Sequence, residues 1–289
     1  MDATTRIEKA LDAALERAEV PECPPKLAAA IRYAVQPGGA RIRPRLCLAV
    51  AAACGDDHPA LTDAAASAIE ILHCASLVHD DLPCFDDAEL RRGKPSVHKA
   101  FGEAQAVLVG DALIVMAFET LARGAALVPQ RLPGLVMTIA RSTGAPTGII
   151  AGQAWESEPN IHLSNYHKAK TGSLFAAATI SGALAAGADP DRWRLLGERL
   201  GEAYQVADDI HDLMSNAEDI GKPSGQDAIH NRPSATAELG FGGAVDRLQL
   251  LLSEAVQSIP QCPGAQELRG IIIAASKAFV PKGIAQRAA

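Results

Sequence analysis

The sequence predicts an all-α protein, and three observations support this fold class. Hydrophobic residues make up 48% of the 289 residues, whereas aromatic residues make up only 4%. Alanine, which has the highest helix propensity, is frequent along the whole chain. Few stretches show the alternation of β-branched and aromatic residues that strands require. A chain of this length and apolar content can bury a core deep enough for an internal cavity, so we expect a single domain over residues 1–289.

Caps and breakers delimit the first four expected helices. Thr4 or Thr5 is a candidate cap of the first helix, and Pro24 and Pro25 open the second segment, which Gly38 and Gly39 then break. Gly55 begins the turn after the third helix. The fourth helix is long and largely apolar, which suits a place in the core. We expect the first, third and fourth helices at residues 4–19, 43–53 and 60–79.

Two irregular segments interrupt the rest of the chain. Residues 80–101 are polar and contain two prolines and a glycine, so we expect a helix end and a loop there. Residues 216–235 contain two glycines and two prolines and are also expected to be irregular. Helical periodicity covers the remaining residues. We expect these helices at residues 104–121, 131–142, 147–155, 164–186, 190–214, 243–258 and 265–278.

Charge and composition exclude several function classes. The formal net charge is −7, which argues against a general nucleic-acid binder but not against a phosphate ligand, since phosphate sites need only local positive charge or a metal. The six cysteines include no C-x-x-C pair, so we expect reduced thiols. The N-terminus is an amphipathic helix of mixed charge, not a signal peptide. No apolar run approaches the roughly 20 residues that span a membrane, so we expect no transmembrane segment and a cytoplasmic protein.

The first unusual motif is a cluster of carboxylates that directly follows the apolar helix 60–79. It contains Asp80, Asp81 and Asp86. Clustered carboxylates repel one another unless solvent or a cation neutralises them. A helix C-terminus also favours cations over acids. The cluster is therefore either a solvated helix end or a metal site.

The second motif, at residues 208–212, lies within the helix expected at 190–214. Asp208 and Asp212 are four residues apart and Asp209 and Asp212 three apart, so all three carboxylates share one face of the helix. No lysine or arginine at these spacings relieves the repulsion. Carboxylate oxygens suit Mg²⁺, which commonly bridges to substrate phosphates. Two such clusters on otherwise apolar helices predict a metal-dependent site.

Basic residues near the two motifs complete the pattern. Arginine binds phosphate oxygens in a bidentate manner, and lysine serves as a point charge. Each basic residue alone is commonly a solvated surface group. Together with the acidic motifs they indicate a site that neutralises two diphosphates with metal and cations. The candidates are Arg41, Arg43, Arg91, Arg92, Lys94, Lys170 and Lys222.

These motifs, in this order, resemble the trans-isoprenyl diphosphate synthases, also called polyprenyl synthetases, over nearly the whole chain. Within that family the resemblance is greatest to bacterial short-chain farnesyl and geranylgeranyl diphosphate synthases of the carotenoid-pathway type. The matching stretches are GGARIRP (38–44), HCASLVHDDLPCFDDAELRRGKPSVH (73–98), GDAL (110–113), AGQAWE (151–156), KTGSLF (170–175), YQVADDIHD (204–212) and GKPSGQD (221–227). The resemblance implies a helical bundle around a deep central cavity, usually as a homodimer.

The resemblance also implies roles for individual residues. Mg²⁺ on the allylic diphosphate would be held by Asp80, Asp81, Asp86, Asp208, Asp209 and Asp212. The same diphosphate would be contacted by Arg91, Lys170, Lys222 and Arg232, the last in place of a family lysine. Thr171 and Gln205 would line the allylic site and help to stabilise the developing carbocation. Isopentenyl diphosphate would be bound by Arg43, His73 and Arg92.

The implied reaction is a head-to-tail condensation of isopentenyl diphosphate with an allylic diphosphate. Ionisation of the allylic substrate builds negative charge on the leaving diphosphate, which Mg²⁺ and the cations stabilise in place. The second double bond attacks the allylic cation, and a diphosphate oxygen takes the released proton. A dry, apolar cavity protects the cation from water.

Two departures from the family bear on activity, and two small residues bear on the length of the product. The family lysine after the Gly-Gly turn is Ala40, and losing one charge-assisted contact costs about 1.5–3 kcal/mol if nothing replaces it. The family acid after the Gly-Gln pair is replaced by Trp155-Glu156. Ala75 and Ser76 stand where short-product relatives carry an aromatic residue, so the expected product is geranylgeranyl diphosphate (C20).

Three alternatives stay open from the sequence. The first is a farnesyl diphosphate synthase, since deeper residues such as Leu72, Leu113 or Met116 can also limit the product. The second is a non-catalytic partner subunit of a prenyltransferase, which Ala40 favours and the intact acidic motifs oppose. The third is a class I terpene cyclase, which lacks a second motif of this kind.

Overall fold

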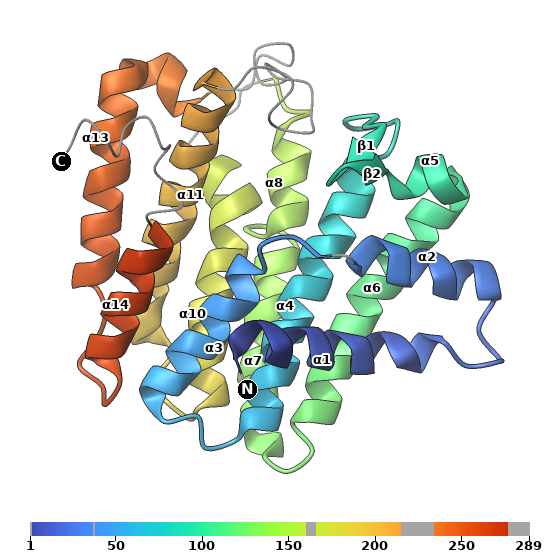
Figure 1. The fold of residues 1–289 in the computed structure, drawn as a ribbon, viewed down its shortest axis with the longest axis horizontal. Helices are drawn as coiled ribbons and strands as arrows, with labels where there is room; N and C mark the ends of the chain where they lie inside the picture. Colours follow the sequence, from blue (N-terminus) through green and yellow to red (C-terminus); the bar gives the residue numbers. More distant parts are fainter. Residues whose placement is uncertain (1, 37, 160–165, 215–233, 277–289) are drawn as a thin grey trace. The chain divides into compact units, whose positions relative to one another are not determined.

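The computed structural model describes residues 2–36, 38–159, 166–214 and 234–276, and it is predominantly helical (Figure 1). The strands in this described part are β1 (Leu90–Arg91) and β2 (Lys94–Pro95), which pair as a short antiparallel hairpin. The predicted all-α class is confirmed.

By their internal contacts the residues form two compact units, Met1–Ala140 with Ser181–Ala188 and Arg141–Ile180 with Asp189–Ala289. The unit boundaries fall within α7 (Leu132–Thr143) and α10 (Ser173–Ala185). The other helices of the first unit are α1 (Ala3–Leu15), η1 (Glu16–Ala18), α2 (Pro25–Val35), α3 (Ile42–Cys54), α4 (Pro59–Asp80), α5 (Val97–Phe101), α6 (Glu103–Gly124) and η2 (Pro129–Arg131). Those of the second are α8 (Ile149–Trp155), the π-helical turn η3 (Lys168–Gly172), η4 (Asp191–Trp193), α11 (Arg194–Met214), α13 (Ala235–Gln257) and α14 (Ala265–Ser276).

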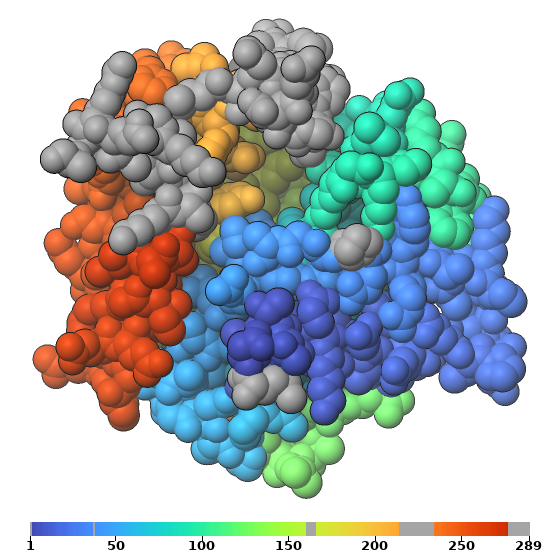
Figure 2. Space-filling model, viewed as in Figure 1, coloured from blue at the N-terminus to red at the C-terminus, as the bar shows by residue number. Residues whose placement is uncertain are grey.

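Helix α4 is the centre of the first unit. It packs most extensively against α6 and also contacts α1, α2 and α3 (Figure 1). Its alanines and aliphatic residues are buried on several sides, as expected of a helix that is apolar nearly all round. Helix α1, capped by the Asp2 carboxylate, lies at the surface of the face shown in Figure 2. The packing of α4 fixes the point at which the first acidic motif begins.

Helices α4 and α6 are long and apolar enough to cross a membrane by length and composition. The length of unbroken apolar runs predicts no such segment. In α4, 78% of the apolar window is buried within the protein, as in the core helix of a soluble domain. In α6 only 44% is buried, and this helix exposes Val107, Leu108 and Val115.

Helix α11 is the centre of the second unit. It packs along α13 and against η3, and α13 in turn contacts α14 (Figure 1). Two glycines allow the close packing of η3. A Cβ atom on Gly201 would lie 2.7 Å from the Cα of Gly172, and one on Gly152 would collide with the backbone of Lys170. Small residues therefore hold η3 tightly between α8 and α11.

Three element boundaries differ from the prediction. The stretch predicted as one helix at 164–186 contains η3 before α10, because Gly172 meets α11 at close range. The predicted loop 80–101 contains the β1–β2 hairpin and the short helix α5. Helix α13 begins eight residues before the predicted 243, since the glycines near its start obscure the periodicity and Gly240 interrupts it with a φ of 68°.

A buried ion pair ties the start of α3 to the core. Arg41 has a left-handed φ of 50° and donates to Glu70 of α4 at 2.7 Å and to Glu8 of α1 at 2.8 Å. The side chains of Arg41 and Glu70 are each 2% exposed. Arg41 is one of the candidate phosphate ligands predicted from the sequence. In the structure its guanidinium is buried and paired with Glu8 and Glu70. The structure gives Arg41 a structural role instead.

All six cysteines are free thiols, as the sequence predicts. Two of them, Cys47 and Cys74, are fully buried. Burial raises the pKa of Cys74 to about 12, so its thiol stays protonated near neutral pH.

We predict that Arg41→Met destabilises the protein by about 3–5 kcal/mol, because it leaves Glu70 charged and buried without its partner. The measurement is the free energy of unfolding in urea. Arg41→Met with Glu70→Leu is expected to recover most of the loss. Arg123→Ala, which removes an exposed pair with Glu119, is the control and costs less than about 1 kcal/mol. Equal losses for the single and double changes at the buried pair would contradict this account.

Candidate active site

The first acidic motif lies at the C-terminal end of α4, where the chain folds back on itself. Asp80 is the last residue of α4 and Asp81 its C-cap. The backbone N–H of Asp86 donates to the carbonyl oxygen of Asp80 at 3.0 Å, and that of Asp87 donates to Leu82 at 3.1 Å. This turn brings Asp86 next to Asp80. These two predicted ligands, six residues apart in sequence, are therefore neighbours in space.

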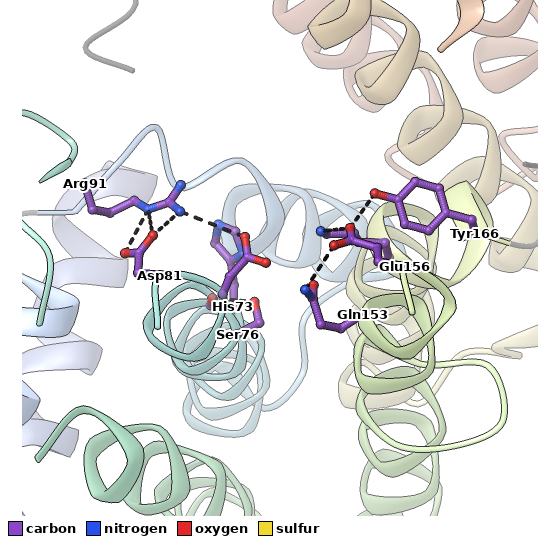
Figure 3. A network of polar contacts seen from close by, with 9 residues as sticks. His73, Ser76, Asp81, Arg91, Gln153, Glu156 and Tyr166 are labelled. Carbon is purple, nitrogen blue, oxygen red and sulfur yellow. Dashed lines mark hydrogen bonds and ion pairs between the residues drawn. The ribbon is translucent and has the colours of Figure 1, made fainter. Parts of the chain in front are cut away.

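Asp81 is the most deeply buried acid of the first motif. It is 2% exposed, and both its oxygens accept from the Nε of Arg91, at 2.9 and 3.1 Å. The Nη2 of Arg91 also donates to Asp81 and lies 3.9 Å from Asp80 (Figure 3). The predicted diphosphate ligand Arg91 is thus held in a fixed orientation by the motif itself.

Arg92 occupies the turn of the β1–β2 hairpin. Arg92 and Gly93 have φ values of 54° and 76°, the left-handed conformation that a two-residue hairpin turn requires. This conformation costs a non-glycine residue roughly 1–2 kcal/mol. A Cβ on Gly39 would lie 3.1 Å from the guanidinium carbon of Arg92, so glycine lets this side chain lie close to the backbone without a tight contact. The turn directs Arg92 to the loop that ends in Ala40.

His73 lies within reach of the charges of both predicted arginine partners. Its pKa is held well below the usual value, first by burial and then by the positive charges of Arg43, Arg92, Arg91 and Arg41. The charges of Arg43 and Arg92, the two arginines predicted to bind isopentenyl diphosphate together with His73, therefore act on this imidazole. A neutral imidazole among guanidinium groups can donate one hydrogen bond to an anion without adding a charge of its own.

The two predicted chain-length residues lie on α4, one turn above the acidic motif. Ala75 is 2% exposed. The hydroxyl of Ser76 donates to the carbonyl oxygen of His73 at 2.8 Å, as Figure 3 shows from close by. The structure thus places both residues on the helix that ends at the first acidic motif.

In the second unit, Lys170 and Thr171 lie in the π-helical turn η3, a geometry that often marks functional sites. The carboxylate of Glu156 accepts from the Nζ of Lys170, from the hydroxyl of Tyr166 at 2.7 Å and from Gln153 at 3.2 Å (Figure 3). Sequence reasoning notes Glu156 only as a departure from the family and misses Tyr166. The signal was present, since Glu156 replaces the family acid and keeps its charge.

A chain of hydrogen bonds links Thr171 to the second acidic motif. The hydroxyl of Thr171 donates to the Oε1 of Gln205 at 2.8 Å, and the Nε2 of Gln205 donates to Asp209 at 2.9 Å. The other oxygen of Asp209 accepts from the backbone N–H of Ala235 at 2.7 Å. The structure therefore brings together Thr171 and Gln205, as their shared predicted role requires.

The carboxylates of the second motif differ in exposure. Asp208 is exposed and Asp212 partly exposed, whereas Asp209 is only 3% exposed. Within the described ranges, no three His, Cys, Asp or Glu side chains lie close enough to hold a metal ion by themselves. Carboxylate donors of this kind suit Mg²⁺, which typically takes one or two carboxylates and fills its shell with water and substrate phosphate. The donor set of each unit therefore fits the metal. The predicted ligands Lys222 and Arg232 lie outside the described residues.

We predict that the wild-type protein loses stability as the pH is lowered from 6.5, in part because unfolding then allows His73 to be protonated. Its folded pKa is lowered, so the unfolded chain binds this proton more readily, and stability is lost as pH falls below the unfolded value. His73→Gln should reduce the slope of unfolding free energy against pH by up to about 1.4 kcal/mol per pH unit in this range. Urea denaturation between pH 7.5 and 5.5 measures both slopes. Parallel curves for the two proteins would contradict the assignment.

Comparison with known proteins agrees with this arrangement. The family model described as polyprenyl synthetase matches residues 24–277. The chain is 58% identical over 282 residues to a geranylgeranyl diphosphate synthase of Cereibacter sphaeroides, with 98% of each chain covered. It is 53% identical to a geranylgeranyl diphosphate synthase of Rhodobacter capsulatus, with 94% of each covered.

A solved structure extends this likeness to the fold. It is the geranyltransferase of Helicobacter pylori complexed with magnesium and isoprenyl diphosphate, which is 30% identical with a TM-score of 0.78 and covers 95% of this chain and 97% of its own. The matches span nearly the whole sequence and include both acidic motifs. The chain belongs to the polyprenyl synthetase family.

Proposed function

We propose that this protein is a geranylgeranyl diphosphate synthase, which condenses isopentenyl diphosphate with allylic diphosphates head to tail in the trans configuration. One observation carries the proposal: the chain is 58% identical, over 98% of both lengths, to a relative named for this activity. The arrangement of the predicted residues within each unit supports it. The proposed product is the C20 diphosphate, and the proposed domain spans residues 1–289.

In the first unit we assign the isopentenyl diphosphate to Arg43, His73 and Arg92. The cations neutralise the diphosphate and the neutral His73 donates to it. Arg91, oriented by Asp81, binds the allylic diphosphate. Asp80 and Asp86, which the backbone turn brings together, hold Mg²⁺ on that diphosphate.

In the second unit we assign Lys170 to the allylic diphosphate and Asp208 and Asp212 to a further Mg²⁺. Lys170 would exchange part of its bond with Glu156 for a bond with the substrate. Thr171 and Gln205 present oriented polar atoms to the allylic carbon skeleton, where positive charge develops. Lys222 and Arg232 are assigned to the allylic diphosphate from the sequence alone.

The proposed reaction needs no protein base. The carbon–oxygen bond of the allylic diphosphate breaks and diphosphate leaves with the electron pair. The double bond of isopentenyl diphosphate then forms the new carbon–carbon bond, and the released diphosphate takes the proton. Mg²⁺, when bound, neutralises charge on the departing diphosphate. Arg91 and Lys170 lower the same barrier by holding cations where that charge develops.

We further propose a soluble, cytoplasmic homodimer. Helix α6 exposes Val107, Leu108 and Val115, the last of which is 68% exposed. Large exposed apolar side chains gathered on one helix favour a protein partner, and a second copy of the chain is the simplest one. Sedimentation equilibrium should report two chains per particle. A single chain at micromolar concentration would contradict this part of the proposal.

The activity is tested with purified protein, Mg²⁺, isopentenyl diphosphate and, in turn, the C5, C10 and C15 allylic diphosphates. We expect a Mg²⁺-dependent C20 product. A product that stops at C15 would favour the farnesyl diphosphate synthase alternative. Absence of product from every primer would favour a non-catalytic partner subunit, which Ala40 supports as the second candidate because the family lysine is missing there.

We predict that Ala75→Phe shortens the main product from C20 to C15. The larger ring would stand beside the growing chain one turn above Asp80 and block further extension. The measurement is the ratio of C15 to C20 product, which does not depend on how much of the variant folds. Overpacking at this buried position costs about 1–3 kcal/mol, so the assay is run below the temperature at which unfolding begins. An unchanged ratio would refute the role of Ala75.

A further inference from the structure

Asp209 is the most deeply buried acid of the second motif, and its surroundings differ from those of a metal ligand. It is 3% exposed, whereas Asp208, one residue earlier, is exposed. A buried carboxylate is stable only when its oxygens are hydrogen-bonded or paired. Each oxygen of Asp209 has a protein donor, one from Gln205 of the same helix and one from Ala235 of α13. A metal ion at Asp209 would have to share an oxygen with one of these protein donors.

The bond to Ala235 caps helix α13 with a carboxylate that belongs to another helix, α11. Ala235 is the first residue of α13, and backbone N–H groups in the first turn of a helix have no partner within it. Asp209 accepts from that N–H at 2.7 Å, and the hydroxyl of Ser234 accepts from Ala237 at 3.2 Å. The cap of α13 is therefore shared between its own Ser234 and a carboxylate of α11. The bond from Ala235 thus fixes the start of α13 against α11.

The bond to Gln205 sets the direction of the whole chain of hydrogen bonds. A carboxylate only accepts, so the Gln205 amide must turn its NH₂ group to Asp209. Its carbonyl oxygen then faces Thr171, whose hydroxyl must donate. The charge of Asp209 thereby determines which way the Thr171 hydroxyl points, although the two residues do not touch.

We propose that Asp209 is a positioning residue that caps α13 and fixes the hydrogen-bond polarity of Gln205 and Thr171, and that Asp208 and Asp212 are the metal-binding acids of this motif. The effect on catalysis rests on the proposed function. The effect on structure does not, because it follows from the hydrogen bonds alone.

Asp209→Asn tests the polarity while keeping the shape of the side chain. The asparagine carbonyl still accepts from Ala235, but its NH₂ group now faces Gln205. The Gln205 amide must flip, and Thr171 then accepts instead of donating. We expect kcat to fall about tenfold, as for one lost hydrogen bond, while the Mg²⁺ concentration for half-maximal rate changes less than about twofold. The matched change Asp208→Asn should raise that Mg²⁺ concentration at least about tenfold.

Moving the negative charge from position 209 to position 205 should restore the activity that Asp209→Asn loses. In Gln205→Glu with Asp209→Asn, the asparagine donates to the new carboxylate, which accepts from Thr171 as the original amide does. All the hydrogen bonds and the net charge are retained, but position 209 no longer carries a carboxylate. Gln205→Glu alone sets two carboxylates against each other and is the control. The double variant should recover most of the kcat lost in Asp209→Asn, at an unchanged Mg²⁺ requirement.

Hydrogen exchange of the Ala235 amide, measured without Mg²⁺ or substrate, provides a readout that does not depend on activity. Exchange should accelerate about tenfold in Asp209→Asn, because the acceptor of the Ala235 N–H is no longer charged. It should also accelerate in Gln205→Glu, where a second carboxylate repels Asp209. The double variant should exchange at about the rate of Asp209→Asn, because position 209 is a neutral acceptor in both proteins. Equal rates in all four proteins would overturn the positioning role.

The two proposals fail in different ways. If Asp209→Asn raises the Mg²⁺ requirement as much as Asp208→Asn and the double variant gains no activity, Asp209 is a metal ligand and the inference is wrong. If the wild type forms no product at all, the proposed function fails. The exchange rates at Ala235 then still decide whether Asp209 caps α13.

Discussion

The structure depends on one electrostatic constraint: carboxylates that are clustered on apolar helices must be neutralised locally. Each unit meets it in the same way. One acid of each motif is buried and bound by protein donors, Asp81 by Arg91 and Asp209 by Gln205 and Ala235. The remaining acids of the motifs are more exposed. Buried carboxylates without such partners would destabilise the protein by several kcal/mol each. The two buried acids therefore hold the scaffold, and the less buried acids are the ones we assign to ligands.

Glycines, as well as the buried acids, determine where the ligand-binding cations lie. Gly39 leaves room for Arg92, and Gly152 and Gly201 let α8 and α11 close on the turn that carries Lys170 and Thr171. Arg41, buried against Glu70, anchors the start of α3 two residues before Arg43. The glycines and the buried Arg41 thus determine where the ligand-binding charges lie. This arrangement suits a reaction in which preorganised cations stabilise a departing diphosphate.

Much of this could be predicted from the sequence, and the exceptions have physical causes. Helix 60–79 is apolar and uninterrupted, so its bounds were predicted to within one residue. The π-helical turn could not be predicted, because it depends on the approach of α11 at Gly172. The partnership of Arg41 with Glu8 and Glu70 depends on contacts between distant segments. Motif spacing predicted which residues gather, such as His73 with Arg43 and Arg92, but not that Asp81 and Asp209 would be buried.

Our central claim is that the less buried acids of both motifs bind an allylic diphosphate through Mg²⁺. Calorimetric titration of the wild type with a non-hydrolysable allylic diphosphate analogue, with and without Mg²⁺, tests it most directly. The account predicts binding at least about 100-fold tighter with Mg²⁺, and loss of most of that gain in both Asp80→Asn and Asp208→Asn. Equal affinity in the presence and absence of Mg²⁺, or a gain that survives both substitutions, would contradict it.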